Sequence, residues 1–166
     1  IKKINDDLDD SIISQLTNSV LTYSDLITNR KTDYKFDLEK FTNVNGKTGI
    51  YVQYSQVRAK KLLENFEFKN SELNSLTLND TDKELLSKLY LFCYFLEQSA
   101  FLNEPHHLAN YLYEISSLFN QFYESEKILE INDSNHLSSK MYITNLFITT
   151  VQNVMWCLGI TPVSKM

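Results

Sequence analysis

The chain has 166 residues and a formal net charge of −5, with 43% hydrophobic and 13% aromatic residues. This apolar content excludes a disordered chain, and the acidic balance argues against a generic nucleic-acid-binding protein, which is usually basic. With three glycines and two prolines, the chain also lacks the turn residues that a β-sandwich or barrel needs. Long helices are therefore expected.

The first part of the chain combines one predicted helix with a polar, extended stretch. Apolar residues recur at helical spacing from about Ile12 to Ile27, and Asp10 and Ser11 are both candidate N-caps. Every second residue from Tyr34 to Leu38 is then apolar, which is a weak signal for extended backbone. Asn45-Gly46 marks a turn before the next helix.

A second helix is expected from Ile50 to about Phe66. At about 100° per residue, its apolar positions form one stripe that faces a core. Tyr51, Tyr54 and Arg58 fall together on the flank beside this stripe. Gln53 points elsewhere and is expected to make an internal hydrogen bond. From the residues alone, the two tyrosines are best interpreted as packing residues at the edge of the core.

Two further helices follow a polar connector. Thr81 and Glu84 fit a capping box for a helix that runs to about Phe101 and is apolar nearly all round, which is typical of a central helix. The next helix is expected to begin with Asn103 as its cap and Pro105 in its first turn. Its apolar residues step by four and three, as in a packing seam. The seam consists of Leu108, Leu112, Ile115, Phe119 and Phe122.

The last predicted helix covers about Leu137 to Leu158. Gly159 suits the position just after its end, and Ile160 can pack back onto the helix. Pro162 prevents the helix from continuing. The fold class predicted from the whole pattern is all-α: an antiparallel helical bundle of four or five helices, preceded by a helix and an extended segment.

Residues that could perform catalysis or bind a metal are sparse. The chain contains no phosphate-binding glycine loop, dinucleotide fingerprint or nucleophile elbow, so no catalytic residue is assigned. His106 and His107 are adjacent and should diverge on a helix, so no metal site is expected. Cys93 and Cys157 form no C-x-x-C pair, and each is expected to be a small buried residue of the core. The absence of a cysteine pair fits a reducing compartment. No signal peptide or membrane-length apolar run is visible, and neither membrane nor DNA is expected as a partner.

Four stretches of the sequence occur in the order in which a known family has them. They are LTYSDLITNRKTDYKFDLEKF, GKTGIYVQYSQVRAKKLL, EPHHLANYLYEISSLFNQFYE and LGITPVSKM. Together they resemble the C-terminal part of arginyl-tRNA synthetase, a class I aminoacyl-tRNA ligase. The first resembles the segment that leaves the catalytic domain of that enzyme, and the second the start of its helical anticodon-binding domain, called the DALR domain. The last is similar to the family's closing sequence, which also ends on Met.

The resemblance implies a division of the chain and a function for the whole enzyme. Residues 1–47 would be the C-terminal end of the catalytic region and a connector, and residues 48–166 the DALR domain. The full enzyme would attach arginine to tRNA(Arg) in the cytoplasm, using ATP and Mg²⁺. The class I nucleotide-binding motifs are absent from this chain, so its expected partners are the catalytic domain of the same polypeptide and the anticodon stem-loop of tRNA(Arg). The fragment alone is expected to hold no cofactor and to be inactive.

The resemblance also implies roles for single residues. The family's pattern Y-x-Q-Y-x-x-x-R matches Tyr51, Gln53, Tyr54 and Arg58, and in the family the two tyrosines and the arginine face the anticodon loop. Proteins bind the bases of single-stranded RNA by stacking them on aromatic side chains. Tyr123 matches the family's Phe-Tyr pair and is either a further stacking face or a residue that packs on the bundle.

Other candidates for RNA contact are less specific. By the same resemblance, Met166 would return to the anticodon side, and Asn110 and Tyr113 are weaker candidates. A local basic patch is expected despite the negative total charge, because RNA responds to local potential. Its members would be Arg30, Lys31, Lys47, Arg58, Lys60 and Lys61.

Two alternatives to this function stay open at the level of sequence. One is a helical bundle that binds other proteins and whose aromatic residues all belong to the core. The other is the anticodon-binding domain of the related cysteinyl enzyme, for which no counterpart of the TGIYVQY stretch is known.

Overall fold

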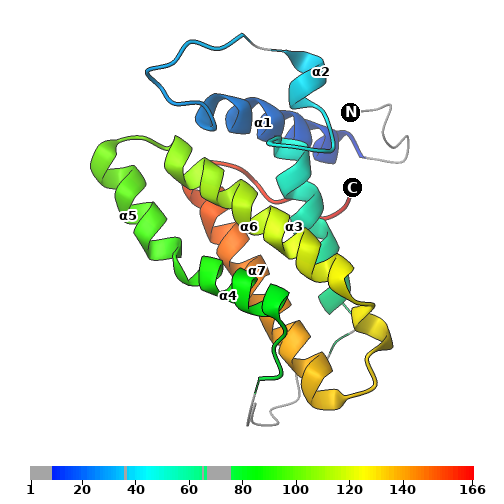
Figure 1. Cartoon of the computed structure of the whole chain (residues 1–166). Helices are drawn as coiled ribbons and strands as arrows, with labels where there is room; N and C mark the ends of the chain where they lie inside the picture. Colours follow the sequence, from blue (N-terminus) through cyan, green and yellow to red (C-terminus); the bar gives the residue numbers. More distant parts are fainter. Residues whose placement is uncertain (1–8, 36, 65, 67–75) are drawn as a thin grey trace.

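The computed structural model of the chain describes residues 9–35, 37–64, 66 and 76–166, and within them every regular element is helical (Figure 1). The all-α prediction is therefore confirmed. The elements are α1 (Asp10–Leu26), α2 (Leu38–Phe41), α3 (Gly49–Leu63), α4 (Asp80–Tyr90), α5 (Phe92–Leu102), α6 (His106–Ser125), a 3₁₀ turn η1 (Ile128–Glu130) and α7 (Ser134–Cys157).

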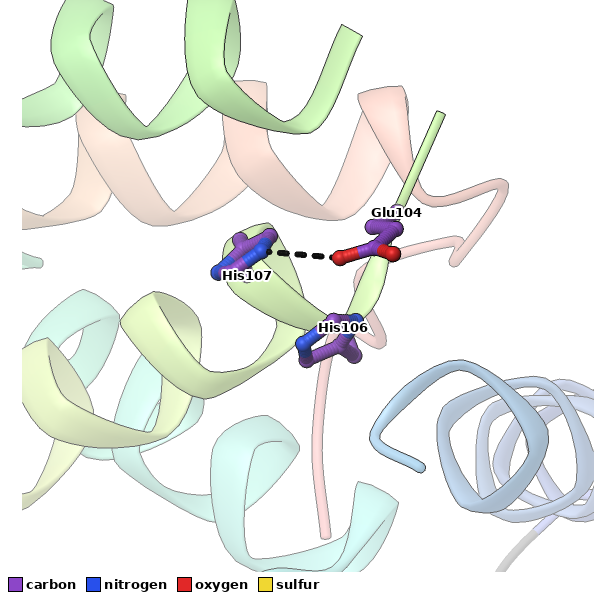
Figure 2. A group of neighbouring side chains, drawn as sticks. All are labelled: Glu104, His106 and His107. Atoms are coloured by element: carbon purple, nitrogen blue, oxygen red, sulfur yellow. Dashed lines mark hydrogen bonds and ion pairs between the residues drawn. The ribbon is translucent and has the colours of Figure 1, made fainter. Parts of the chain in front are cut away.

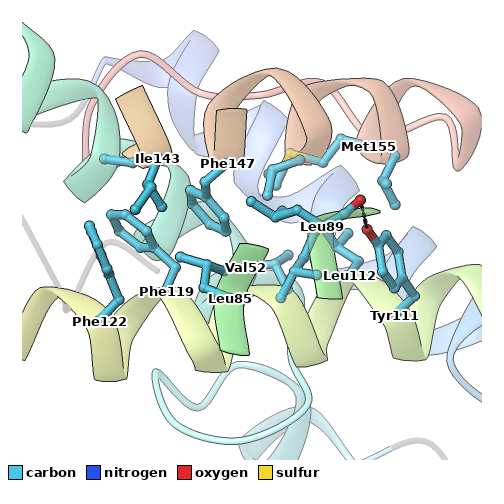
Figure 3. Close-up of a cluster of buried hydrophobic side chains, with 14 of the residues drawn as sticks. Val52, Leu85, Leu89, Tyr111, Leu112, Phe119, Phe122, Ile143, Phe147 and Met155 are labelled. Carbon is cyan, nitrogen blue, oxygen red and sulfur yellow. Dashed lines mark hydrogen bonds between the residues drawn. The ribbon is translucent and has the colours of Figure 1, made fainter. Parts of the chain in front are cut away.

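Helix α6 lies at the centre of the bundle, where it contacts α1, α3, α4, α5 and α7. All five residues of its predicted seam are at most 3% exposed, which confirms the seam. Figure 3 shows this core, in which Phe119 of α6 stacks on Phe147 of α7 with ring centroids 4.1 Å apart. Val52 of α3 and Leu85 of α4 are fully buried in the same cluster. The seam thus joins three neighbouring helices into one core.

The prediction of one central helix that ends near Phe101 is wrong. The chain breaks at Leu91, with φ −81° and ψ 6°, and forms α4 and α5 instead. The hydroxyl of Tyr111, on α6, lies 3.1 and 3.2 Å from the carbonyl oxygens of Lys88 and Leu89, in the last turn of α4. Helix α5 then packs mainly against α6, and much of its apolar surface faces solvent; Phe101 is 85% exposed.

The capping box predicted from Thr81 and Glu84 is formed two residues earlier, by Asn79 and Asp82. Asn79 Oδ1 accepts from the Asp82 backbone N–H, and Asp82 Oδ2 accepts from the Asn79 N–H. The other oxygen of Asp82 lies 2.7 Å from the ammonium of Lys140 on α7, and neither side chain is exposed. Asp82 thus caps α4 and forms a buried ion pair with α7 at the same time. The local sequence around Asp82 does not show that Lys140 is its partner.

Asn103 ends α5 and does not begin α6, contrary to the prediction. Its φ of +53° places it in the left-handed region, which asparagine tolerates better than most residues. Pro105 precedes His106, the first residue of α6. The end of α7 follows the prediction. Gly159 has φ +71°, and the Ile160 N–H donates to the carbonyl oxygen of Met155 on α7 at 2.8 Å.

The remaining helix ends differ from the predictions by a few residues. The N-cap of α1 is Asp9, and not Asp10 or Ser11. Helix α7 begins at Ser134, earlier than expected. The alternating stretch that was expected to be extended leads into the short α2, and its middle residue, Phe36, lies outside the described residues.

The burial predicted for the cysteines is wrong. Cys93 lies on the solvent-facing side of α5, and Cys157 is the last residue of α7; both are exposed. Among the described residues, no helix is long and apolar enough to cross a membrane.

Helix α1 packs closely on α3 at Gly49. A Cβ atom added to Gly49 would lie 2.5 Å from the carbonyl oxygen of Ser19 in α1, so the contact requires glycine. Around it, residues of α1 such as Leu16 and Val20 form a second buried cluster with Ile50 of α3. Helix α1 is therefore part of the packed body, and the division of the chain at residue 47 stays a prediction.

Replacing Gly49 with Ala should lower the free energy of unfolding by about 1–3 kcal/mol, because the new methyl group forces α1 away from α3. Urea unfolding followed by circular dichroism measures the change. Ser134→Ala, at the exposed first residue of α7, is the control and should stay within about 0.5 kcal/mol of the original. Equal effects of the two changes would contradict the close approach of α1 and α3.

Candidate nucleic-acid interface

The side chain of Arg58 lies between two tyrosine rings. Its Cζ atom is 4.6 Å from the ring centroid of Tyr54, one turn earlier on α3, and 4.7 Å from that of Tyr123, near the end of α6. The Tyr54 hydroxyl accepts a hydrogen bond of 2.6 Å from Arg58 Nη2. Helical spacing and the contact between α3 and α6 thus bring three of the predicted site residues into one group, which we call the Tyr-Arg-Tyr stack.

Residues of α6 fix the orientation of Arg58. Its Nη1 donates to Asn120 Oδ1 at 3.1 Å and lies 3.3 Å from Glu124 Oε1. Asn120 also donates to the hydroxyl of Ser55, the neighbour of Tyr54 on α3, at 2.9 Å. The guanidinium therefore has protein partners on both terminal nitrogens. What it presents is a flat charged group that holds two aromatic rings in place.

A cavity of about 660 Å³ lies beside the stack and has Tyr51, Tyr54, Arg58 and Met166 in its wall. The rest of its lining is Val44, Asn45, Ser117, Asn120, Gln121 and Glu124. A smaller cavity of about 320 Å³ is lined by Tyr54, Arg58, Tyr123 and Met166 as well. All five predicted site residues therefore border these two cavities, and Tyr54, 42% exposed, borders both.

Tyr51 is half-buried and packs against Tyr113 of α6, one of the two weaker candidates. Its ring centroid lies 5.4 Å from that of Tyr113. Lys47 Nζ is 5.5 Å from the Tyr113 ring and donates to Asn110 Oδ1 at 2.8 Å. The line of aromatic and basic side chains thus continues along α6 from the stack toward the N-terminus of that helix.

Four of the six basic residues expected to form one patch are spread along α6. Lys31 pairs with Glu104 just before this helix, and Lys47 contacts its first turns. Arg58 contacts its last turns, and Lys61 lines the smaller cavity beside it. At about 1.5 Å per residue, these contacts extend over more than 20 Å, so the positive charge forms a line and not a cluster.

Sequence reasoning missed Asn120 and Glu124. Both lie on the face of α6 that carries Tyr123. Their positions, three residues before and one residue after Tyr123, can be seen in the sequence. Their partners are on α3, however, and only the packing of the two helices reveals that they bind Arg58.

Glu104, His106 and His107 gather at the turn between α5 and α6 (Figure 2). The two imidazole rings lie with centroids 4.1 Å apart, so the divergence expected for adjacent histidines is wrong. Both rings lie at the first turn of α6 with an angle of 34° between their planes, and His107 Nε2 is 3.3 Å from Glu104 Oε2. Burial lowers the pKa of His106, whose Nδ1 has no hydrogen-bond partner within the described residues.

This cluster is poorly suited to a metal ion. It lies at the N-terminus of α6, where the helix dipole disfavours a cation. The Lys31 ammonium is 2.8 Å from Glu104 Oε1 and occupies the carboxylate. The expectation of no metal site stays a prediction, and the contact that the cluster makes is with the segment around Lys31.

Comparison with known proteins assigns the chain to a family. Residues 52–166 match the family model of the DALR anticodon binding domain. The chain belongs to the DALR anticodon binding domain family. Arginine–tRNA ligase of Francisella tularensis subsp. novicida (strain U112) is 34% identical over 141 residues, which are 80% of this chain and 24% of that protein. The DALR chain thus spans about a quarter of the length of the curated relatives that it matches.

Two solved structures resemble the DALR chain in three dimensions. Arginyl-tRNA synthetase from Plasmodium falciparum has a TM-score of 0.80 and 26% identity, covering 92% of this chain and 27% of that one. The enzyme of Thermus thermophilus shares the fold, with a TM-score of 0.90 and 21% identity over 99% of this chain and 29% of that one. The resemblance seen in the sequence is therefore confirmed, and neither the protein-binding bundle nor the cysteinyl enzyme is favoured.

Two substitutions beside Arg58 should differ in their cost to stability. Asn120→Ala removes the hydrogen bond that Arg58 Nη1 donates to Asn120 and the one that Asn120 donates to the buried Ser55 hydroxyl, and should lower the free energy of unfolding by about 1–3 kcal/mol. Glu124→Gln weakens an ion pair whose carboxylate is 69% exposed, and should change it by less than about 0.5 kcal/mol. Urea denaturation of both variants measures the difference; equal costs would show that Asn120 does not organise the stack.

Proposed function

We propose that this chain is the anticodon-binding part of an arginine–tRNA ligase and that the Tyr-Arg-Tyr stack is the face that contacts RNA. The observation that supports this most strongly is the assembly of Tyr54, Arg58 and Tyr123 from two helices beside an open cavity, in a chain of the DALR family. We propose arginine as the amino acid because the curated relatives and solved structures that resemble the chain are named as arginine enzymes.

The stack can hold an unpaired base in a way that fits single-stranded RNA. Tyr54 offers an aromatic ring at the border of both cavities, and each base that stacks on such a ring contributes about 1–3 kcal/mol. Around the larger cavity, the exposed Gln121 provides an amide that can hydrogen-bond a base edge. Tyr51, whose ring contacts that of Tyr113 on α6, lines the same cavity.

Arg58 would act mainly by holding the two rings and by supplying positive charge. Its ion pair with the exposed Glu124 is a surface pair, worth less than about 1 kcal/mol. An RNA phosphate can therefore replace Glu124 as the partner of Arg58 at little cost. Lys61, in the wall of the smaller cavity, adds charge beside it. Binding through so few cations should be weak in the isolated chain and sensitive to salt.

The rest of the reaction would take place elsewhere in the polypeptide. Activation of arginine with ATP and Mg²⁺, and transfer to tRNA(Arg), would belong to a catalytic domain of the same protein, and the expected compartment is the cytoplasm. In this proposal the described residues select the tRNA by its anticodon stem-loop and carry no catalytic group.

Binding of the fluorescently labelled anticodon arm of tRNA(Arg), followed by anisotropy at low salt, tests the proposal. Tyr54→Ala should weaken binding roughly 5- to 150-fold, which corresponds to the loss of one stacked base. Arg58→Ala should weaken it at least as much, because both rings lose their support. Tyr90→Ala on α4, where the ring is 88% exposed, is the matched control and should leave the affinity unchanged.

Absence of binding, or equal affinities for the Tyr54→Ala and Tyr90→Ala variants, would count against the proposed function. An arm of the same length and shape from a tRNA for another amino acid should bind more weakly than that of tRNA(Arg). Equal affinity for the two arms would leave general RNA binding in place but would contradict selection of tRNA(Arg).

A further inference from the structure

Two buried glutamines of α3 hold the segment that follows α7. Gln53 has no exposed surface, and its amide makes bonds to two other parts of the chain. Its Nε2 lies 2.8 Å from the Ser19 hydroxyl on α1 and 2.8 Å from the carbonyl oxygen of Thr161, and its Oε1 accepts from the Val163 N–H at 3.0 Å. The internal hydrogen bond expected for Gln53 is therefore confirmed, and its main partner is the C-terminal segment.

Gln56, one turn later and 1% exposed, completes this anchor. Its Nε2 donates to the carbonyl oxygen of Val163 at 2.6 Å. Both backbone polar groups of Val163 are thus paired with side chains of α3, and the Val163 side chain is buried in the same cluster as Val57. Burying a primary amide costs free energy unless it is hydrogen-bonded, so the bonds to this segment and to Ser19 account for the presence of Gln53 in the core. Gln56 is bonded through its Nε2 alone, and its Oε1 has no partner within the described residues.

The anchor decides where Met166 lies. This residue comes three positions after Val163, packs against the cluster that contains Val57, and borders both cavities beside Tyr54 and Arg58. The two residues between them are exposed. Terminal residues are usually poorly ordered unless something ties them down, and here the tie is the set of hydrogen bonds to the two glutamines.

We infer that Gln53, supported by Gln56, is a positioning residue that places Met166 at the RNA-contacting cavities; for its effect on RNA this inference rests on the proposed function. Gln53 is suited to the task because one amide donates to the carbonyl of Thr161 and accepts from the N–H of Val163 at the same time. A carboxylate supplies only the acceptor, and an aliphatic side chain supplies neither. Gln53 thus faces away from the cavities and acts on them through the C-terminal segment.

The position of Met166 can be followed without RNA by labelling the methionine methyl groups with ¹³C. Rings near Met166 shift its methyl resonance away from the random-coil position, whereas Met141 and Met155 report on the buried core. In Gln53→Leu the Met166 signal should move to the random-coil position and sharpen, with the other two signals unchanged. Gln152→Leu, at an exposed position of α7, is the control and should leave all three in place.

A Met166 signal that stays unchanged in folded Gln53→Leu would overturn the inference. If Gln53→Leu does not fold, Gln56→Leu, which loses one hydrogen bond to the segment, replaces it with the same expected movement of Met166. An unchanged signal in that variant would be equally decisive against positioning.

RNA binding provides the functional readout through a double-mutant cycle. Gln53→Leu and Met166→Ala should weaken binding of the anticodon arm by the same factor, and the double variant should be no weaker than either. Effects that multiply would show that Gln53 does not act through Met166 and would overturn its role in binding. If the unmodified chain binds no RNA, the proposed function fails, while the methionine signals still decide the positioning of Met166.

Discussion

The contact between α3 and α6 is the interaction on which the candidate site depends. Helix α3 supplies Tyr54 and Arg58, and α6 supplies Asn120 and Tyr123. The contact is close because the α3 positions that face α6 include small residues, such as Ser55 and Ala59, which are fully buried. Without this packing, Arg58 would be an ordinary surface side chain and the two tyrosines would not share a cation.

The same contact couples the site to the rest of the molecule. Phe119 of α6 joins the core to the stack, because its ring stacks on Phe147 of α7 and lies 6.3 Å from the ring of Tyr123. Helix α1 is fixed to this body in two places: Gly49 allows the backbones to approach, and the Tyr23 hydroxyl donates to the carbonyl oxygen of Ala109 on α6 at 3.1 Å. On the α3 side, Gln53 joins α1 and the C-terminal segment. The larger cavity is walled by α3, α6, the segment just before α3 and the segment that follows α7.

Local spacing was enough to predict much of the fold and part of the site. The four-residue step from Tyr54 to Arg58 and the seam of α6 follow from helical periodicity, which depends only on neighbours along the chain. The roles of Tyr123 and Met166 were accessible only through resemblance to a family. Asn120 and Glu124 could not be predicted, since their function depends on which helix packs against α6.

The incorrect predictions share a physical cause. The run of apolar residues that suggested a central helix contains a break, which the hydroxyl of Tyr111 stabilises from another helix. The start of α4 is set by the buried ion pair between Asp82 and Lys140, far apart in sequence. Cys93 was expected inside because its neighbours are apolar, but α5 has only one side covered. In the first two cases a partner that is distant along the chain overrides the local pattern, and in the third the packing of α5 against the other helices decides which of its sides is exposed.

The most direct test of the RNA-contacting face is ¹⁹F NMR of the chain labelled with 3-fluorotyrosine, titrated with the anticodon arm of tRNA(Arg). The resonances of Tyr51, Tyr54 and Tyr123 should shift or broaden as RNA is added, because these rings border the cavities. Those of Tyr90 and Tyr94, which are exposed on α4 and α5, should stay in place. Shifts confined to Tyr90 and Tyr94 would contradict the assignment of the RNA-binding face to α3 and α6.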